Sequence, residues 1–244
     1  NTVTTSRFLA YLIFSVPSAK LIEAVGYKRT MVISLFVMVA GALLFLPAAH
    51  MISFPIFLTA SFVLATGVCA LQTAANPYVS ILGPEHSAPA RLTLAQAFNS
   101  LGTAVAPLVV GAYILTDPTK VSSQAAVAQT VRGPYIAIAC GLLVLGVAVM
   151  FMHLPAITTT QDFKPTGAVS TRSIWTYRHT VLGMVGIFFY VGLEIALAAN
   201  AIKFFGTQGI ENKDKAALLA SFYPLAMMIG RFLGTAVMKA IKAE

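Results

Sequence analysis

The sequence predicts an all-α polytopic membrane protein. Of its 244 residues, 58% are hydrophobic and only 10% are charged, and the mean hydropathy is +0.83. A globular domain carries about a quarter charged residues. Stretches of roughly 20 residues lack any formal charge, which is long enough to cross a bilayer core. Lipid offers backbone groups no water and the apolar pattern does not alternate, so these stretches are expected to be helices.

Seven apolar segments are expected to span the membrane. They cover residues 7–19, 30–49, 54–82, 92–115, 134–154, 180–205 and 216–241. Between them lie a charged turn at 20–29, a Pro- and Gly-rich turn at 83–89, a polar loop at 116–133 and a charged turn at 206–215. The longest polar stretch, 155–177, is rich in Thr and Ser and is interpreted as a linker.

The net charge of +8 comes from single basic residues placed between apolar segments. No basic patch interleaves with aromatic residues, which argues against a nucleic-acid partner. Alternate loops form two sets. One set has ten basic residues: Lys20, Lys28, Arg29, Arg91, Lys164, Arg172, Arg178, Arg231, Lys239 and Lys242. The other set has five: Lys120, Arg132, Lys203, Lys213 and Lys215. The larger set is therefore expected in the cytoplasm.

No motif for covalent or metal chemistry is visible. Cys69 and Cys140 lie in apolar segments without metal or redox spacing, and the four histidines fall at segment ends or in loops. A membrane enzyme would show clustered histidines or carboxylates at one membrane face, so the protein is not expected to be an enzyme or to hold a metal or cofactor.

The turn at residues 19–29, AKLIEAVGYKR, resembles the signature turn between the second and third helices of the major facilitator superfamily. Ala19 stands where Gly is usual, and Glu23 where Asp is usual. The resemblance implies that Glu23, Gly26, Lys28 and Arg29 form a turn that helps to hold one conformation, with Gly26 permitting a tight bend. An ordinary positive-inside loop is the alternative.

Residues 71–102 resemble a narrower group within that superfamily, the fucose permease and glucose/galactose transporter family. The similarity rests on LQTAANP at 71–77, LGPE at 82–85, Arg91-Leu92 and LAQAFNSLG at 94–102. YVGLE at 190–194 and GRFLG at 230–234 also fit. The family fold has 12 helices in two six-helix halves, so the resemblance implies that the seven spans are helices two to eight.

The domain organisation follows from this register. Residues 1–154 are expected to form the N-terminal half without its first helix, that is, helices 2–6. Residues 155–179 would be the cytoplasmic linker, and 180–244 the start of the C-terminal half, helices 7–8. The chain begins without Met and ends just after an apolar segment, as expected of a fragment.

Two polar stripes lie on consecutive helices. Gln72, Asn76 and Ser80 are four residues apart and share one side of a helix. The second stripe, spaced by threes and fours, comprises Thr93, Gln96, Asn99 or Ser100, and Thr103. Amides and hydroxyls supply the donors and acceptors that a sugar requires, so the stripes can face one solute cavity. The alternative is hydrogen bonding across a dry helix interface, and it is at least as well supported for Asn76 and Ser80. The family resemblance places sugar-binding residues at Gln96 and Asn99.

The sequence leaves the identity of the coupling ion undecided. In the fucose permease a proton-coupling carboxylate stands at the position of Gln72, which cannot take up a proton, and the other coupling carboxylate lies in the first helix. Glu194 is the acid nearest the middle of a span, where insertion costs about 2.5–3.5 kcal/mol. It is a candidate to carry H⁺, to coordinate Na⁺ or to bind sugar. The alternative is a structural role through Tyr190, one turn earlier. Arg231 is expected to snorkel or to brace a turn.

Together these patterns predict ion-coupled symport of a glucose-, galactose- or fucose-type monosaccharide by alternating access. The predicted substrate-binding residues are Gln72, Asn76, Gln96, Asn99 and Glu194. The protein is expected to be a multi-pass, monomeric component of a bacterial inner membrane, with sugar and lipid as its partners. Alternatives on the same fold are an exporter of drugs or other small organic compounds and a sensor that binds sugar without moving it.

Overall fold

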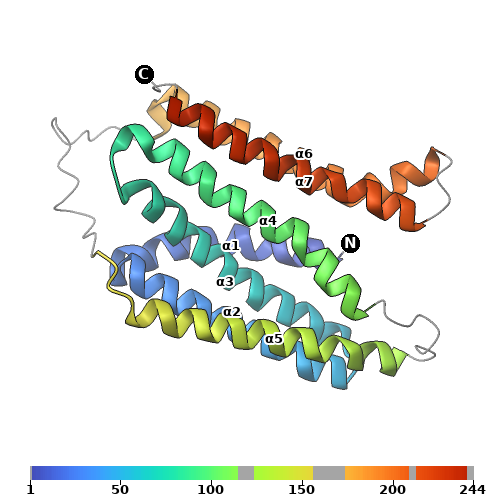
Figure 1. The fold of residues 1–244 in the computed structure, drawn as a ribbon. Coiled ribbons are helices and arrows are strands. Elements are labelled where there is room, and N and C mark those ends of the chain that lie inside the picture. The colour runs from blue at the N-terminus through green and yellow to red at the C-terminus, as the bar shows by residue number, and fades with distance from the viewer. Residues whose placement is uncertain (1, 115–123, 156–173, 209–212, 241–244) are drawn as a thin grey trace. The chain divides into compact units, whose positions relative to one another are not determined.

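A computed structural model describes residues 2–114, 124–155, 174–208 and 213–240 (Figure 1). These residues form seven α-helices and two short 3₁₀ helices. The helices are α1 (Thr2–Val25), α2 (Tyr27–His50), α3 (Phe54–Ile81), η1 (Glu85–Ser87), α4 (Ala88–Ile114), α5 (Gln124–Phe151), η2 (Ile174–Thr176), α6 (Arg178–Thr207) and α7 (Lys213–Ala240). The all-α prediction with seven long helices is confirmed.

The helices have the length that a membrane span requires. Within the described residues, five stretches are long and apolar enough to cross a membrane: α1, α2, α3, residues 132–151 of α5 and residues 178–197 of α6. Helices α4 and α7 have 27 and 28 residues, about 40 Å of helix, so their length also suffices. Both helices also coincide with apolar segments that the sequence predicts to span the membrane, residues 92–115 and 216–241.

The largest boundary differences from the sequence prediction are in α5 and α1. Helix α5 begins at Gln124, so the predicted polar loop at 116–133 is wrong from residue 124 onward, and Pro134 lies inside the helix. Helix α1 continues past the predicted residue 19 to Val25. Most of the predicted linker, residues 156–173, lies outside the described residues, and residues 174–176 form η2. The predicted division into two halves and a linker stays a prediction.

The chain forms two compact units, which are described separately. Unit 1 comprises residues 1–92, 106–163 and 238–244, and unit 2 comprises residues 93–105 and 164–237. Unit 1 contains α1, α2, α3 and α5, with α2 packed on α3 and α5 and with α1 packed on α3. Unit 2 contains the middle of α4 together with α6 and nearly all of α7.

Glycines allow α2 and α3 to approach closely in unit 1. A Cβ atom at Gly41 would lie 2.6 Å from the backbone N of Leu64, and one at Gly67 would lie 2.6 Å from Cγ of Met38. Small residues at helix contacts are the usual way in which membrane helices gain dispersion energy without a hydrophobic driving force. The backbones of α2 and α3 therefore meet with no room for a side chain at either position.

The predicted signature turn depends on one glycine conformation. Gly26 separates α1 from α2 with φ 83° and ψ 167°, a region that is essentially restricted to glycine. Its carbonyl accepts hydrogen bonds from the backbone N of Thr30 (3.1 Å) and from Oγ1 of Thr30 (2.9 Å). Glu23 is exposed and makes no ion pair with any described residue. The tight bend attributed to Gly26 is thus present, whereas the predicted conformational role of this turn stays a prediction.

Arg91 closes the turn between α3 and α4. Its Nε donates to the carbonyl of Val79 at 3.1 Å and its Nη2 to that of Ser80 at 2.6 Å, so it satisfies carbonyls in the last turn of α3. Its Nη1 donates to the carbonyl of Pro84 at 3.0 Å and to Oγ of Ser87. A cation at the carboxyl end of a helix is also favoured by the helix dipole.

Candidate solute-binding site

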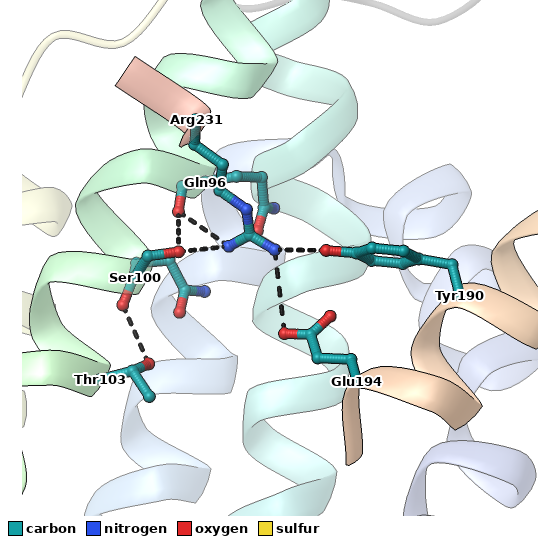
Figure 2. Close-up of polar contacts among 7 residues, drawn as sticks. Gln96, Ser100, Thr103, Tyr190, Glu194 and Arg231 are labelled. Carbon is teal, nitrogen blue, oxygen red and sulfur yellow. Dashed lines mark hydrogen bonds and ion pairs between the residues drawn. The ribbon is translucent and has the colours of Figure 1, made fainter. Parts of the chain in front are cut away.

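Arg231 lies at the centre of a polar cluster in unit 2 (Figure 2). It projects from α7 toward α4 and α6. Its Nη1 donates to the backbone carbonyl of Gln96 at 3.1 Å and to Oγ of Ser100, and its Nη2 donates to the hydroxyl of Tyr190 at 3.0 Å. One guanidinium therefore links three helices, which suits a group with five donors in a rigid plane.

Glu194 faces the same guanidinium from α6, one helical turn after Tyr190. Its Oε1 lies 3.8 Å from Nη2 of Arg231. This separation is an ion pair but is too long for a hydrogen bond. The side chain of Arg231 is 21% exposed and that of Glu194 is 27% exposed, so both remain within reach of a small solute.

Helix α4 supplies the neutral side of the cluster. Ser100 is 1% exposed, and its hydroxyl donates to the carbonyl of Gln96 at 3.0 Å while it accepts from Arg231. Oγ1 of Thr103 donates to the carbonyl of Asn99 at 3.1 Å. These bonds use backbone carbonyls of α4. The side-chain amides of Gln96, which is half-buried, and of Asn99, which is exposed, make no hydrogen bond within the described part of the chain.

Two further contacts position Arg231. The ring of Phe232, the next residue, meets that of Phe98 on α4 edge to face, with centroids 5.8 Å apart. Oγ1 of Thr235 donates to the carbonyl of Arg231 at 2.8 Å. The aromatic contact fixes α7 against the same stretch of α4 that carries Gln96 and Ser100, so the guanidinium enters the cluster from a defined direction.

The other predicted binding residues, Gln72 and Asn76, lie on α3 in unit 1, and both are half-buried. The carbonyl of Asn76 accepts a hydrogen bond from Oγ of Ser80 at 3.1 Å. Their spacing does place them on one side of α3. That this stripe faces the same cavity as Gln96 and Asn99 stays a prediction.

Sequence reasoning missed the part played by Arg231. The expectation that it snorkels or braces a turn is wrong, because its guanidinium bonds to α4 and α6 nine residues before the end of α7. Arg231 therefore does not count among the basic residues of the loops. Without it the two sets of loops hold nine and five basic residues, so the predicted orientation is unchanged. The signal that could have found it is the one that found Glu194: a formal charge inside an apolar segment needs a partner.

The cluster offers charge and hydrogen bonding but no metal-ligand set. In the portions of the chain that the structure describes, no group of three His, Cys, Asp or Glu side chains comes together. The available chemistry is reversible recognition of a polar solute by amides, hydroxyls and a carboxylate.

A helical membrane fold with a polar, ion-paired cluster between its helices is typical of membrane transport proteins. The family model of the Major Facilitator Superfamily matches residues 1–244, and the chain belongs to this superfamily.

Curated relatives are sugar transporters by name. The chain is 43% identical over 237 residues to a glucose/galactose transporter of Brucella abortus, covering 96% of this chain and 57% of that protein. It is 34% identical over 240 residues to a putative glucose/galactose transporter of Helicobacter pylori, covering 96% and 58%. It is 30% identical over 253 residues to the L-fucose-proton symporter of Escherichia coli, covering 96% and 57%. The chain thus spans somewhat more than half the length of these relatives.

Solved structures agree with the fold. The crystal structure of the superfamily transporter FucP in the outward conformation is 28% identical to the chain, with a TM-score of 0.82, covering 98% of this chain and 62% of that one. The crystal structure of a substituted form of the E. coli fucose:proton symporter FucP is 26% identical, with a TM-score of 0.76, covering 98% and 63%. The predicted family resemblance is confirmed.

Proposed function

We propose that the chain is part of a symporter that carries a glucose-, galactose- or fucose-type monosaccharide across a bacterial inner membrane by alternating access. Gln96 and Asn99 bind sugar hydroxyls, Gln72 and Asn76 line the same pathway, and Glu194 binds the sugar or the coupling ion. The protein works as a multi-pass monomer and catalyses no covalent chemistry. The bend that contains Glu23, Gly26, Lys28 and Arg29 helps to hold one conformation.

The observation that carries this proposal is the state of the α4 amides. Within the described residues, the side-chain amides of Gln96 and Asn99 make no hydrogen bond, whereas the hydroxyls of Ser100 and Thr103 bond to backbone carbonyls of α4. The ion pair of Arg231 and Glu194 lies in the same cluster, where Arg231 also bonds to the carbonyl of Gln96. A dry packing interface would instead be expected to consume those amides in contacts between helices. The names of the relatives supply the substrate class.

The coupling ion is H⁺ or Na⁺. The name of the E. coli relative, a fucose-proton symporter, supports H⁺. Gln72 cannot carry a proton, so Glu194 is the acid within the described cluster that is placed to respond to an ion. The relatives' names also favour symport over the two alternatives, an exporter of small organic compounds and a non-transporting sugar sensor.

The substrate assignment is tested with Asn99→Ala, expressed from the complete gene that encodes this chain. Uptake of labelled glucose, galactose and fucose should fall at least about tenfold at equal expression, because one amide hydrogen-bonding a sugar hydroxyl is worth that much. The matched control is Asn200→Ala on α6, whose exposed amide has, within the described residues, a hydrogen bond to the carbonyl of Ala196 in its own helix and no other. Unchanged uptake by Asn99→Ala would refute the assignment.

The coupling assignment is tested with Glu194→Gln by measuring counterflow and ion-driven accumulation separately. If Glu194 carries the coupling ion, accumulation should be lost while exchange of sugar persists. Accumulation that equals that of the unsubstituted protein would remove Glu194 as the coupling residue.

A further inference from the structure

The polar cluster contains one cation and one anion among the residues that the structure describes. Arg231 and Glu194 carry these charges, and the groups around them are the amides and hydroxyls of α4, the phenol of Tyr190 on α6 and the phenol of Tyr223 on α7. The formal charge of the cluster is therefore zero. Sugars of the proposed class are also uncharged, whereas sugar acids carry a carboxylate.

We propose that Glu194 makes the site selective for neutral sugars over sugar acids, because it balances the charge of Arg231. This inference rests on the proposed sugar-binding function. It adds to that function the residue that excludes sugar acids, which resemble the proposed substrates chemically.

The two edges of the guanidinium have different surroundings. Nη1 is occupied by the carbonyl of Gln96 and the hydroxyl of Ser100, both on α4. Nη2 has one hydrogen bond, to the hydroxyl of Tyr190, and otherwise faces the carboxylate of Glu194. Nη2 is thus the edge at which an anion can be held, and Glu194 is the anion present.

Glu194 holds this place by charge alone. Its oxygen lies 3.8 Å from Nη2, beyond hydrogen-bond length, and within the described residues its carboxylate accepts no hydrogen bond. Both oxygens are thus left to accept bonds from sugar hydroxyls, which favours a neutral polyol. A sugar carboxylate would instead meet a like charge, and like charges in such a site strongly disfavour binding.

Removal of the carboxylate reverses this preference. Glu194→Gln keeps the size and polarity of the side chain but leaves the positive charge of Arg231 unbalanced. A guanidinium with a free edge binds carboxylates through charge-assisted hydrogen bonds. The same geometry predicts the reciprocal result: Arg231→Gln leaves Glu194 unbalanced and favours a cationic amino sugar.

The test compares four sugars that share one ring: D-galactose, D-galacturonate, the neutral D-galacturonamide and D-galactosamine. Binding is measured by calorimetry on purified protein from the complete gene, unsubstituted and as Glu194→Gln, Glu194→Asp, Arg231→Gln and the double Glu194→Gln/Arg231→Gln variant. Circular dichroism and gel filtration check that each variant is folded.

Glu194→Gln should gain at least about tenfold in affinity for galacturonate relative to galacturonamide, since one charge pair at this separation is worth that much. Arg231→Gln should gain similarly for galactosamine relative to galactose. Glu194→Asp and the double variant should show neither gain. Galacturonamide is similar to galacturonate in size at C6 but is uncharged, so the comparison of the two isolates the effect of charge.

Equal galacturonate affinity in Glu194→Gln and in the double variant would overturn the inference, and so would an unchanged amino-sugar affinity in Arg231→Gln. Either reciprocal variant decides the question if the other fails to fold. The comparison of galacturonate with galacturonamide does not require galactose itself to bind. If the unsubstituted protein binds none of glucose, galactose and fucose, the proposed function fails, which is a separate result from the charge-selectivity comparison.

Discussion

The two units of the chain hold their helices together in different ways. In unit 1, Gly41 and Gly67 bring the backbones of α2 and α3 so close that a single Cβ would clash. In unit 2, a Cβ at Gly102, Gly183, Gly186, Gly192 or Gly230 would meet nothing within 4 Å. There, α4, α6 and α7 meet through the long side chains of Arg231, Tyr190 and Phe98.

This difference indicates which part of the chain can rearrange. Close-packed backbones have few alternative arrangements, because interiors at this density transmit strain rather than absorb it. A guanidinium with several donors can exchange one partner for another at small cost. We therefore expect unit 1 to act as a rigid scaffold and the Arg231 cluster to be the part that responds to a solute.

The largest effect is expected from Gly41→Leu. The new side chain must displace the backbone of Leu64, 2.6 Å from the added Cβ, and overpacking of this kind costs about 3 kcal/mol. Thermal unfolding in detergent should show a clear fall in Tm. The matched control is Gly186→Leu in α6, where the Cβ enters open space and Tm should change little. Equal destabilisation of the two variants would contradict the contrast between the units.

Next in size is Arg91→Ala at the turn between α3 and α4. Its hydrogen bonds to the carbonyls of Val79, Ser80 and Pro84 are lost, and charged hydrogen bonds contribute about 1.5–3 kcal/mol. The control is Arg178→Ala, an exposed arginine at the first residue of α6, in the same predicted cytoplasmic set. If both variants unfold at one temperature, Arg91 does not stabilise the turn.

A smaller loss is expected from Gly26→Ala. No atom lies within 4 Å of the added Cβ, so the cost is backbone strain at φ 83°, about 1–2 kcal/mol. Gly102→Ala has ordinary helical geometry with the same open surroundings, and it should be neutral or slightly stabilising. A Tm for Gly26→Ala at or above that of Gly102→Ala would show that the turn tolerates another conformation.

The smallest effect is the expected difference in stability between alanine variants of two buried serines. Ser100→Ala removes a hydroxyl that accepts from Arg231 and should cost about 1 kcal/mol. Ser34→Ala in unit 1 removes a hydroxyl that bonds, among the described residues, to the carbonyl of Thr30 in its own helix alone, and it should be nearly neutral. Equal Tm values would mean that the Arg231 cluster contributes little to the stability of unit 2.

The sequence by itself determined the helical membrane fold, the seven long helices and the superfamily, and it predicted that the amides of α4 bind a solute. These properties depend on hydropathy, helical spacing and motifs, each of which is contained within one short stretch of chain. The same reasoning marked Glu194, because a charge within an apolar segment is visible without knowing its neighbours. The start of α5 was misplaced because residues 124–133 mix Gln, Thr and Arg with Ala and Val, yet they are helical.

Only the tertiary structure decided which helices meet. Arg231 joins residues 131 and 135 positions earlier in the chain, and Cβ clearance at Gly41 depends on Leu64 of another helix. Periodicity reveals the polar face of each helix but not the partner that this face meets. The charge balance of Arg231 and Glu194 follows from such a meeting, because a local pattern shows that a charge needs a partner but does not identify the partner.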